Sequence, residues 1–558
     1  MKIPASFRIA FPAICIGALA GCASADGAPP QQAKSPQVAV PQVQHPDGES
    51  AQWWFRAGAA EAASRGAMRG HAKNLILFVG DGMSLTTVAA ARILEGQRQG
   101  QSGEEHRLAW EDFPDTALSR TYNTDSQTPD SAGTMSAMAT GAKTRLGVLS
   151  IGQQAARKDC KAALASPLLT LWELAASSGM ATGVVTTARV IHATPGATFA
   201  HSADRAWEND TQLPAEAREA GCTDIARQMV ESRFGTGPDV LMGGGRREFL
   251  PKTTRDPEYP EQTGSRGDGR DLVSEWQVRH PGGSYAWNTA QLQSASDGPL
   301  LALFEPDHMH FEHERAQDGA GEPSLADMTK AAISRLSKNP NGYVLLVEGA
   351  RIDMASHAGN AYRALTETIA LSDAVRAATE ATSADDTLIL VTADHSHTLA
   401  FSGYGRRGNQ ILGKVYGGSR ESIATVDPTA LARDANGLPY TVLNYASGPG
   451  YRSSAASGDA RATGNRRPDL TDVDTEDPDY LQEAIFPLDS ETHGGDDVGI
   501  WATGPGSDAV RGSVEENTVF HFLLQANPRM RAALCAKGDC ENGVPVVLSK
   551  PGDFESRQ

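Results

Sequence analysis

The chain is short of positive charge. Its 558 residues include 50 lysines and arginines against 68 aspartates and glutamates, which gives a net charge of −18. A nucleic-acid partner is therefore not expected, because phosphate backbones are bound by basic surfaces. The same negative charge repels small phosphate-bearing molecules at long range. Any phosphate site must supply its own concentrated positive charge, and bound divalent metal ions do that best.

The apolar run near the N-terminus is too short to cross a bilayer. Residues 9–19 are apolar, and they follow Lys2 and Arg8. This pattern is typical of an export signal over residues 1–22. The signal ends in Leu-Ala-Gly-Cys, which resembles a bacterial lipobox and predicts that Cys22 is lipidated. The protein would then be a membrane-anchored lipoprotein of the periplasm or outer membrane.

A second interpretation of the same region remains open. Residues 23–25, Ala-Ser-Ala, form a small-x-small cleavage site that would release a soluble periplasmic or secreted protein. In both cases the protein leaves the cytoplasm. Residues 23–46 are rich in Ala, Pro and Gln and have little to bury, which predicts a flexible tether.

Cysteine is scarce, with six residues in the whole chain, and two of these belong to the signal and the anchor. The remaining four are Cys160, Cys222, Cys535 and Cys540. An even number in an exported chain indicates two disulfides. The pairing in chain order, Cys160–Cys222 and Cys535–Cys540, is favoured because the last two cysteines are five residues apart. No cysteine has zinc-finger spacing, which excludes a structural cysteine–zinc site.

The composition is that of a soluble globular protein, with 40% hydrophobic and 21% charged residues. The length predicts one large domain with an elaboration. Short, continuously apolar runs are typical of strands buried on both faces. They recur at 75–79, 181–185, 240–242, 344–347, 388–391 and 498–501, with helical patterns between them at 168–178, 324–337 and 361–381. This alternation predicts an α/β fold with a mostly parallel central sheet flanked by helices.

Two segments differ from this pattern, and no internal repeat is present. Residues 401–487 are rich in Gly, Arg, Asp, Ser and Pro and predict a loop-rich insertion. Residues 251–320 are polar and aromatic and predict a second excursion. The main domain is expected to cover 47–525, and a C-terminal segment, 526–558, carries the second disulfide.

Three acidic residues stand at the ends of predicted strands, namely Asp81, Glu348 and Asp394. Open α/β sheets place their ligands at the carboxyl ends of strands. The glycines on either side of Asp81, Gly80 and Gly82, let a ligand approach the backbone closely. Three acids at one sheet edge would repel one another strongly unless cations lie between them.

Further metal-ligating side chains accompany these acids. Asp353 and His357 have i,i+4 spacing, which on a helix puts both on one face, able to chelate one ion. His395 follows Asp394 directly, and His493 precedes the last apolar run. Asp and His are the ligands that borderline-soft and hard divalent metals share.

Ser131 lies in the segment Pro-Asp-Ser-Ala-Gly-Thr, where Pro129 and Asp130 predict a helix start. A serine there meets unpaired N–H groups and the positive end of the helix dipole, so an anion can dock over it. An ordinary helix cap is the simpler interpretation of Ser131 taken alone. In combination with the acids and histidines, Ser131 indicates metal-assisted chemistry on an anionic substrate.

Together these segments resemble the alkaline phosphatase family, its animal-type members as closely as its bacterial ones. The matching stretches are Phe-Val-Gly-Asp-Gly-Met at 78–83, Thr-Tyr-Asn-Thr at 121–124, Pro-Asp-Ser-Ala-Gly-Thr at 129–134, His-Ala-Thr-Pro-Gly-Ala at 192–197, Ala-His-Ser-Ala-Asp-Arg at 200–205, Leu-Val-Glu-Gly-Ala-Arg-Ile-Asp at 346–353, Thr-Ala-Asp-His-Ser-His at 392–397 and Glu-Thr-His-Gly-Gly at 491–495. They occur in the family's order from about residue 75 to 522. The resemblance implies hydrolysis of phosphate monoesters through a covalent phosphoserine on Ser131, a crown-like insertion at 401–487 and a homodimer.

The resemblance also implies the ligands of three metal ions. The two zinc ions would be bound by Asp353, His357 and His493 and by Asp81, Asp394 and His395, respectively. A magnesium ion would be bound by Asp81, Thr194 and Glu348, with His192 close by. Arg205 would clamp the phosphate oxygens, a bidentate task that suits a guanidinium group.

A calcium site of the animal-type members would also have a counterpart here. It would map to Glu258, the carbonyl of Phe304, Glu305 and Glu322. These are all oxygen ligands, which suit calcium. Glu322 stands where the family has aspartate and is one methylene longer.

Two other segments receive a plainer interpretation, and two departures from the family stand out. The His-rich segment 307–313 is interpreted as solvated surface, and residues 53–55, Trp-Trp-Phe, as a packing or dimer-contact segment. The animal enzymes carry extra histidines between Asp353 and His357 that are absent here. The sequence of 401–487 also diverges from the family's insertion.

Two other functions are weighed against a monoesterase. A phosphodiesterase or sulfatase of the same superfamily would share the metal cradle. The sulfatase pattern Cys/Ser-x-Pro-x-Arg is absent at Ser131, however, and diesterases of this type usually carry threonine there. A metal- or phosphate-binding lipoprotein without turnover would be expected to lose Ser131 or Arg205, and both are present.

Overall fold

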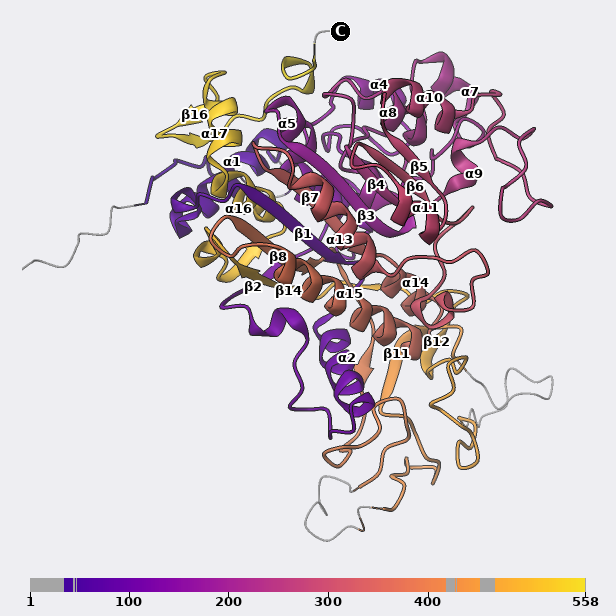
Figure 1. Ribbon diagram of the computed structural model, residues 1–558. Helices are drawn as coiled ribbons and strands as arrows, with labels where there is room; N and C mark the ends of the chain where they lie inside the picture. The colour runs from indigo at the N-terminus through magenta and orange to yellow at the C-terminus, as the bar shows by residue number, and fades with distance from the viewer. Residues whose placement is uncertain are drawn as a thin grey trace, which may run out of the picture. The chain divides into compact units, whose positions relative to one another are not determined.

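A ten-stranded sheet runs through the centre of the protein (Figure 1). In spatial order its strands are β15 (Gly512–Glu515), β2 (Asp115–Arg120), β14 (Val498–Thr503), β8 (Thr387–Ala393), β1 (Asn74–Gly80), β7 (Tyr343–Gly349), β3 (Ala181–Arg189), β4 (Val240–Gly244), β6 (Leu300–Leu303) and β5 (Ser284–Ala286). The strands from β8 to β5 are parallel, and β14 is antiparallel to its neighbours β8 and β2. The predicted α/β fold with a mostly parallel sheet is confirmed.

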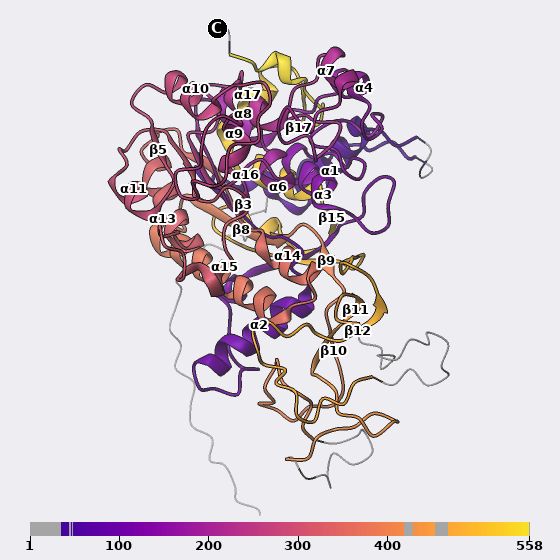
Figure 2. The same cartoon turned by 90° about the vertical axis from the view of Figure 1, so that its right-hand side faces the viewer.

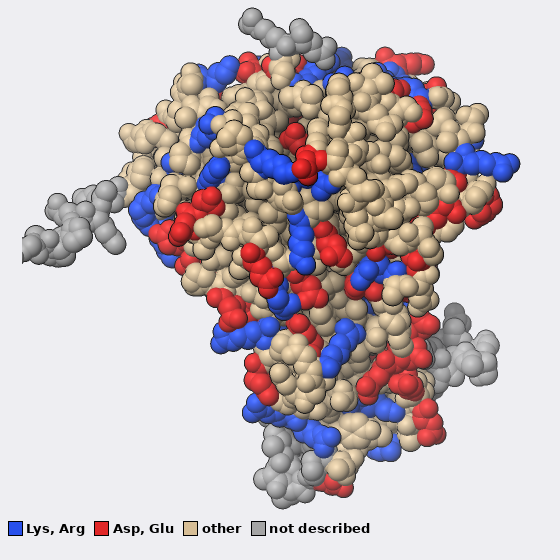
Figure 3. Space-filling model, viewed as in Figure 1, with Lys and Arg blue, Asp and Glu red and all other residues tan. Residues whose placement is uncertain are grey.

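This computed structural model describes residues 35–43, 46, 48–417, 427, 429–451 and 467–556. The predicted signal, the predicted lipidation site Cys22 and most of the predicted tether lie outside the described residues. None of the described helices is both long and apolar enough to cross a membrane. Acidic and basic side chains are interspersed over the face shown in Figure 3.

The central strands are buried because they are apolar on both faces. Along β1, Leu75, Leu77 and Val79 pack into one core cluster, and Ile76 and Phe78 pack into the other. Successive side chains of a strand point to opposite faces, so both sides of the sheet receive apolar residues. Each fully buried side chain of this size contributes roughly 1.5–3 kcal/mol. Continuous apolarity therefore places these strands in the middle of the sheet.

Helices cover both faces of the sheet (Figures 1 and 2). One face packs against α2 (Leu85–Arg98), α13 (Leu325–Leu336) and α15 (Ala361–Ala381), and the other against α1 (Ala51–Arg65), α3 (Ser131–Thr140), α5 (Leu171–Ser177) and α16 (Thr518–Ala526). The shorter helices are α4 (Cys160–Leu164), α6 (Ala193–Gly196), α7 (Ala215–Glu219), α8 (Ile225–Val230), α9 (Arg246–Phe249), α10 (Leu272–Arg279), α11 (Thr289–Ser294), α12 (Glu312–Arg315), α14 (Arg351–His357) and α17 (Pro528–Cys535). The three helices predicted from the sequence correspond to α5, α13 and α15.

The carboxyl ends of β1, β7 and β8 lie side by side. Gly80, the last residue of β1, pairs with Gly349 on one side and with Ala393 on the other. The residues that follow β1 and β8, Asp81 and Asp394, are therefore brought to the same edge of the sheet. This is the edge at which open α/β sheets place their ligands.

Residues 401–487 contribute most of a small separate sheet. Its strands are β10 (Ala400–Phe401), β11 (Leu443–Gly448) and β12 (Ala484–Pro487). In Figure 2 these strands lie below β9 (Ser396–His397) and α14. The extent of the crown-like insertion stays a prediction. Nearby, β9 pairs with β13 (His493–Gly494), which sets His493 opposite His397.

Part of residues 251–320 belongs to the central sheet, which corrects the expectation of an excursion. Both β5 and β6 fall in this segment and extend the sheet beyond β4. All residues of β6 are buried. The apolar run of β6 is only four residues long, and a run this short does not distinguish a buried strand from a loop or helix segment.

Both predicted disulfides are present. The interpretation of residues 53–55 as a packing segment is confirmed in part. Cys160 is bonded to Cys222 and Cys535 to Cys540, with Cα atoms 6.0 and 5.0 Å apart. In α1, Trp54 and Phe55 are buried against the core, as expected of a packing segment. A dimer contact at this segment stays a prediction.

The two disulfides should differ in what they contribute to stability. They close loops with sequence separations of 62 and 5 residues. By the chain-entropy argument, the disulfide that closes the longer loop stabilises the folded protein by about 4 kcal/mol, and the one that closes the shorter loop by about 2 kcal/mol. A variant carrying Cys160→Ser and Cys222→Ser should therefore unfold at a lower urea concentration than one carrying Cys535→Ser and Cys540→Ser. Equal or reversed midpoints would contradict this ranking.

Candidate active site

Three fully buried acidic side chains lie at the carboxyl edge of the sheet. Asp81, Glu348 and Asp394 are all 0% exposed, as their positions at strand ends predicted. The backbone N–H of Gly82 donates to Asp394 Oδ1 at 3.0 Å. Burying several ionised carboxylates without opposite charge costs several kcal/mol each, so the site requires positive charge.

Asp353, His357 and His493 form a first cluster. His357 Nε2 and His493 Nε2 lie 3.3 and 3.4 Å from Asp353 Oδ1, and the two Nε2 atoms lie 3.1 Å apart. The other ring nitrogens face backbone carbonyls, of Glu491 for His357 and of Pro129 for His493. A ring nitrogen facing a carbonyl carries a proton, so in the neutral form of each ring Nε2 is the nitrogen with the free lone pair.

In that form two lone pairs and a carboxylate oxygen face one another, an arrangement that a bound cation would stabilise. A four-coordinate zinc ion with ligand bonds of about 2.0–2.1 Å would hold neighbouring ligand atoms about 3.3 Å apart. The three separations in the first cluster agree with this spacing. The three residues that the resemblance assigns to one zinc ion therefore lie together.

Asp81, Asp394, His395 and Ser131 form a second cluster. His395 Nε2 lies 3.4 Å from Asp81 Oδ1 and 3.3 Å from Asp394 Oδ2. Ser131 Oγ lies 3.1 Å from His395 Nε2 and 3.4 Å from Asp81 Oδ1. The serine hydroxyl thus lies within reach of an ion held by the other three side chains.

A third set of oxygens lies next to these clusters. Asp81 Oδ2, Thr194 Oγ1 and Glu348 Oε1 are all buried and make no hydrogen bond of normal geometry to a described residue, although the Thr194 hydroxyl lies close enough to Glu348 to lower the pKa of that carboxyl group. Each comes from one of the three residues that the resemblance assigns to magnesium. Buried polar atoms are normally paired, and three unpaired oxygens suit a hard cation that prefers oxygen ligands.

Burial and mutual repulsion raise the pKa values of three acidic groups in this site. Burial raises the pKa of Asp81 well above its ordinary value, and the charges of Asp394, Asp353 and Glu348 raise it further. Burial also raises the pKa of Glu348 to about 8 and raises the pKa of Asp394. Without metal ions some of these carboxyl groups would be protonated at neutral pH, whereas bound cations favour the ionised form.

His397 and Glu491 belong to the site but were not assigned a role from the sequence. His397 Nε2 lies 2.8 Å from Asp353 Oδ1, and its Nδ1 bonds to Glu491 Oε2. Burial alone would lower the pKa of His397, but the hydrogen bonds to Asp353 and Glu491 raise it to about 10. Both residues lie in the matched stretches, so the signal was present, but those motifs do not indicate which side chain bonds to which.

Ser131 is the first residue of α3, and Asp130 is the N-cap. Asp130 Oδ1 accepts hydrogen bonds from the backbone N–H groups of Gly133 at 3.1 Å and Gly147 at 2.9 Å. Its other oxygen, Oδ2, accepts from Arg205 Nη1 at 3.0 Å. The cap thus fixes the helix start and holds the guanidinium group beside the serine.

The His-rich segment 307–313 is not simply solvated surface, which corrects that interpretation. His308 packs edge-to-face on His192 with ring centroids 5.3 Å apart, and its Nε2 lies 2.6 Å from Arg189 Nη1. His192 Nε2 in turn lies 3.3 Å from Arg205 Nη2. Alternating polar residues resemble an exposed loop in the sequence, but here the segment packs against the wall of the site.

The four residues of the predicted calcium site lie in one neighbourhood. Arg246 Nη2 donates to Glu258 Oε2 at 2.9 Å, and Arg246 Nη1 donates to the carbonyl of Phe304 at 3.0 Å. Glu305 lies close to Glu258 and Asp318, with carboxylate oxygens within 4.8 Å of one another, and it also lies beside His310, as Glu322 does. Burial raises the pKa of both of these glutamates to about 8.

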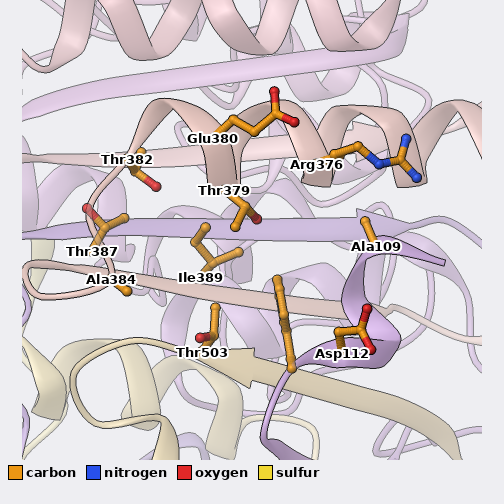
Figure 4. A pocket seen from close by; sticks show the side chains of 11 residues that line it. Ala109, Asp112, Arg376, Thr379, Glu380, Thr382, Ala384, Thr387, Ile389 and Thr503 are labelled. Atoms are coloured by element: carbon orange, nitrogen blue, oxygen red, sulfur yellow. The ribbon is translucent and has the colours of Figure 1, made fainter. Parts of the chain in front are cut away.

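A pocket of about 500 Å³ lies elsewhere on the protein (Figure 4). Its lining includes Arg376 and Thr379 near the end of α15 and Thr387 at the start of β8. Because Asp394 follows the carboxyl end of β8, the pocket and the site lie at opposite ends of that strand. None of the site residues lines this pocket.

A parallel sheet with metal-ligating side chains and a serine at its carboxyl edge defines a metal-dependent hydrolase. The family model described as alkaline phosphatase matches residues 72–528. The chain belongs to the alkaline phosphatase family, as its motifs predicted, and it is an enzyme that hydrolyses phosphate monoesters.

Relatives and solved structures agree with this assignment. The alkaline phosphatase of Gadus morhua is 42% identical over 463 residues, which cover 82% of this chain and 91% of the relative. The tissue-nonspecific isozyme of Gallus gallus is 42% identical over 82% of this chain and 84% of its own length. The Thermus thermophilus alkaline phosphatase structure, 25% identical, has a TM-score of 0.56 over 82% of this chain and 92% of that one. The enzyme from the Antarctic bacterium TAB5, 20% identical, shows the same fold with a TM-score of 0.55 over 82% of this chain and 99% of that one.

Metal-free protein should lose stability as the pH rises. Glu348 has a pKa of about 8 in the folded, metal-free state against an ordinary value of 4.5. A carboxyl group with a raised folded pKa stabilises below its unfolded pKa, and this contribution is lost as the pH rises through the folded value. Chelator-treated protein should therefore melt at a lower temperature at about pH 8 than at about pH 5, and zinc with magnesium should reverse the loss.

The control for this experiment is Glu348→Gln, which should weaken the pH dependence of the metal-free melting temperature. Metal-free wild-type protein that was equally stable at both pH values would contradict the role given to the buried carboxyl groups.

Proposed function

We propose that Ser131 is the nucleophile of the phosphatase reaction. Its Oγ attacks the phosphorus atom, the Ser131 O–P bond forms, and the ester P–O bond breaks as the alcohol leaves with a proton. Water then attacks phosphorus, which breaks the Ser131 O–P bond, releases inorganic phosphate and restores the hydroxyl. The observation that carries this proposal is the Ser131 hydroxyl 3.1 Å from His395 Nε2 and 3.4 Å from Asp81 Oδ1.

The proposed metal ions are two zinc ions and one magnesium ion. Their proposed ligands are Asp353, His357 and His493 for one zinc, Asp81, Asp394 and His395 for the other, and Asp81, Thr194 and Glu348 for magnesium. Ligand-atom spacing supports the zinc sets, and three unpaired oxygens support the magnesium set. Bound there, the ions would supply positive charge that stabilises the attacking and departing oxygens.

Arg205 is proposed to bind the non-bridging oxygens of the phosphoryl group. Contacts to Asp130 Oδ2 and to His192 hold its guanidinium group in place. A planar guanidinium held in this way can donate two parallel hydrogen bonds to phosphate. The N-terminal N–H groups of α3 add partial positive charge at Ser131.

His397 is proposed to act on Asp353 rather than on the substrate. It lies between Asp353 and Glu491, both of which accept hydrogen bonds from its ring. This arrangement fixes the orientation of Asp353 toward His357 and His493. Side chains that hydrogen-bond to a metal ligand, without contacting the ion themselves, set the orientation and basicity of that ligand.

Export and lipid anchoring through Cys22 are proposed for the protein as a whole. Two disulfides in the structure support an oxidising compartment outside the cytoplasm. The homodimer and the calcium ion expected from the resemblance stay predictions.

Ser131→Ala tests the covalent mechanism. The variant should lose at least about a thousandfold in kcat with p-nitrophenyl phosphate, because no other group takes over the attack. Its metal content, measured by elemental analysis, should be unchanged. The matched control is Ser136→Ala in the same helix, where the hydroxyl bonds only to backbone groups. A Ser131→Ala rate near that of the wild type would rule out the phosphoserine, and faster hydrolysis of bis-p-nitrophenyl phosphate would favour a diesterase.

Cys22→Ser tests the anchor. The variant should move from the membrane fraction to the soluble fraction while phosphatase activity is retained, because a lipid chain inserts only when the cysteine is modified. Wild-type protein that is already soluble would support signal cleavage after residues 23–25 instead.

A further inference from the structure

His308 reaches the wall of the site from a distant part of the chain. It follows β6, whereas His192 lies in the turn after β3, where its backbone N–H donates to the carbonyl of Arg189 at 2.9 Å. In the sheet, β4 separates β3 from β6. The chain crosses the end of β4 at Gly244, where a Cβ atom would lie 2.1 Å from the carbonyl oxygen of Asp307. Only glycine allows so close a crossing, and the crossing brings His308 to His192.

Arg189 confines the ring of His308. The backbone nitrogen of Arg189 lies 3.2 Å from His308 Nδ1, and Arg189 Nη1 lies 2.6 Å from His308 Nε2. Burial and the charge of Arg189 lower the pKa of His308 to about 3, so its ring is neutral at neutral and alkaline pH. Because arginine only donates hydrogen bonds, the neutral ring accepts one of the two.

Arg189 is itself held in place. Its Nε and Nη2 donate to the two carboxylate oxygens of Glu208 at 2.6 and 2.7 Å. Glu208 is buried. A bidentate ion pair of this kind fixes the plane of the guanidinium group. The ring of His308 is therefore packed against a rigid support.

The ring of His308 in turn packs on His192. The two rings are edge-to-face, with centroids 5.3 Å apart and planes at 84°. His192 Nε2 lies 3.3 Å from Arg205 Nη2. A guanidinium group can only donate, so Nε2 must be the acceptor, with its lone pair directed at Arg205. Rotation of the His192 ring would lose this hydrogen bond, and packing against His308 opposes that rotation.

The hydrogen bond to His192 is one of two that orient the guanidinium group of Arg205. The other runs from Nη1 to Asp130 Oδ2 at 3.0 Å, so each terminal nitrogen is held by one neighbour. Each terminal nitrogen also carries a second N–H group. These two groups can donate to a phosphate in parallel while both neighbours hold the guanidinium plane.

We propose that His308 is a positioning residue for phosphate binding. Its ring holds His192 in the orientation in which Nε2 accepts from Arg205, and Arg205 is thereby held for the phosphoryl oxygens. The inference rests on the phosphate-binding role proposed above for Arg205, and it adds a residue to which the resemblance gives no part. The ring contact acts here, rather than a charge on His308.

Binding of inorganic phosphate measures this role without turnover. Full-length variants loaded with zinc and magnesium are titrated with phosphate by calorimetry, and their metal contents are compared by elemental analysis. His308→Ala should bind phosphate about tenfold more weakly at unchanged metal content, because the guanidinium group is no longer held in its orientation. For p-nitrophenyl phosphate, KM should rise by a similar factor while kcat changes far less.

The matched control is His313→Ala in the same segment. His313 makes a similar edge-to-face contact, with Tyr362 at 5.0 Å between ring centroids, and neither residue is among those assigned to the phosphatase reaction. This variant should bind phosphate as tightly as the wild type. Equal affinity in His308→Ala and the wild type would overturn the proposal.

Two conservative variants separate ring packing from hydrogen bonding and guard against a folding defect. His308→Phe keeps a flat ring against His192 and should bind phosphate nearly as tightly as the wild type. His308→Gln keeps an acceptor for Arg189 but has no ring, and it should bind phosphate as weakly as His308→Ala. The reverse ranking would overturn the proposal, because the contact with Arg189 would then be the one that matters.

Two further substitutions locate the effect. If His308 acts through His192, adding His308→Ala to His192→Ala should weaken phosphate binding no further, whereas additive losses would contradict the proposal. Arg205→Ala tells the two possible failures apart. Wild-type affinity in Arg205→Ala would remove the proposed phosphate clamp and this inference with it. Weak binding in Arg205→Ala together with wild-type affinity in His308→Ala would overturn the inference alone.

Discussion

Mutual repulsion among buried carboxylates is the constraint from which the rest of this structure follows. Asp81, Glu348 and Asp394 come from adjacent parallel strands and are fully buried at one sheet edge. Folding alone does not relieve this repulsion, because the strands that bring the acids together are fixed by apolar packing on both faces. Bound cations do relieve it, so the stability of the fold and the affinity for metal ions are coupled.

The side chains around the acids are arranged to hold ions rather than to neutralise charge directly. His357 and His493 each donate Nδ1–H to a backbone carbonyl, which leaves the Nε2 atoms 3.1 Å apart as acceptors. Hydrogen bonds to Asp353 and Glu491 raise the pKa of His397 to about 10, which favours its cationic form. The single serine at the start of α3 faces this arrangement, so a nucleophile and concentrated positive charge meet where a phosphate would bind.

Much of this could be predicted from the sequence, for a physical reason. Continuous apolar runs such as the one in β1 identify strands buried on both faces, and the residue after such a strand must lie at the sheet edge. Asp81 and Asp394 could therefore be placed without a structure. The pairing of distant elements could not, so the contact of His397 with Asp353 was missed. Short runs and polar surroundings also concealed β6 and the contacts of His308 with His192 and Arg189.

The central claim is that two ions lie between side chains far apart in the sequence. Anomalous X-ray diffraction from crystals of the purified protein, recorded at the zinc edge, tests it most directly. The account predicts one anomalous peak within bonding distance of Asp353, His357 and His493, and another within bonding distance of Asp81, Asp394 and His395. Purified, active protein without anomalous density at either position would contradict it.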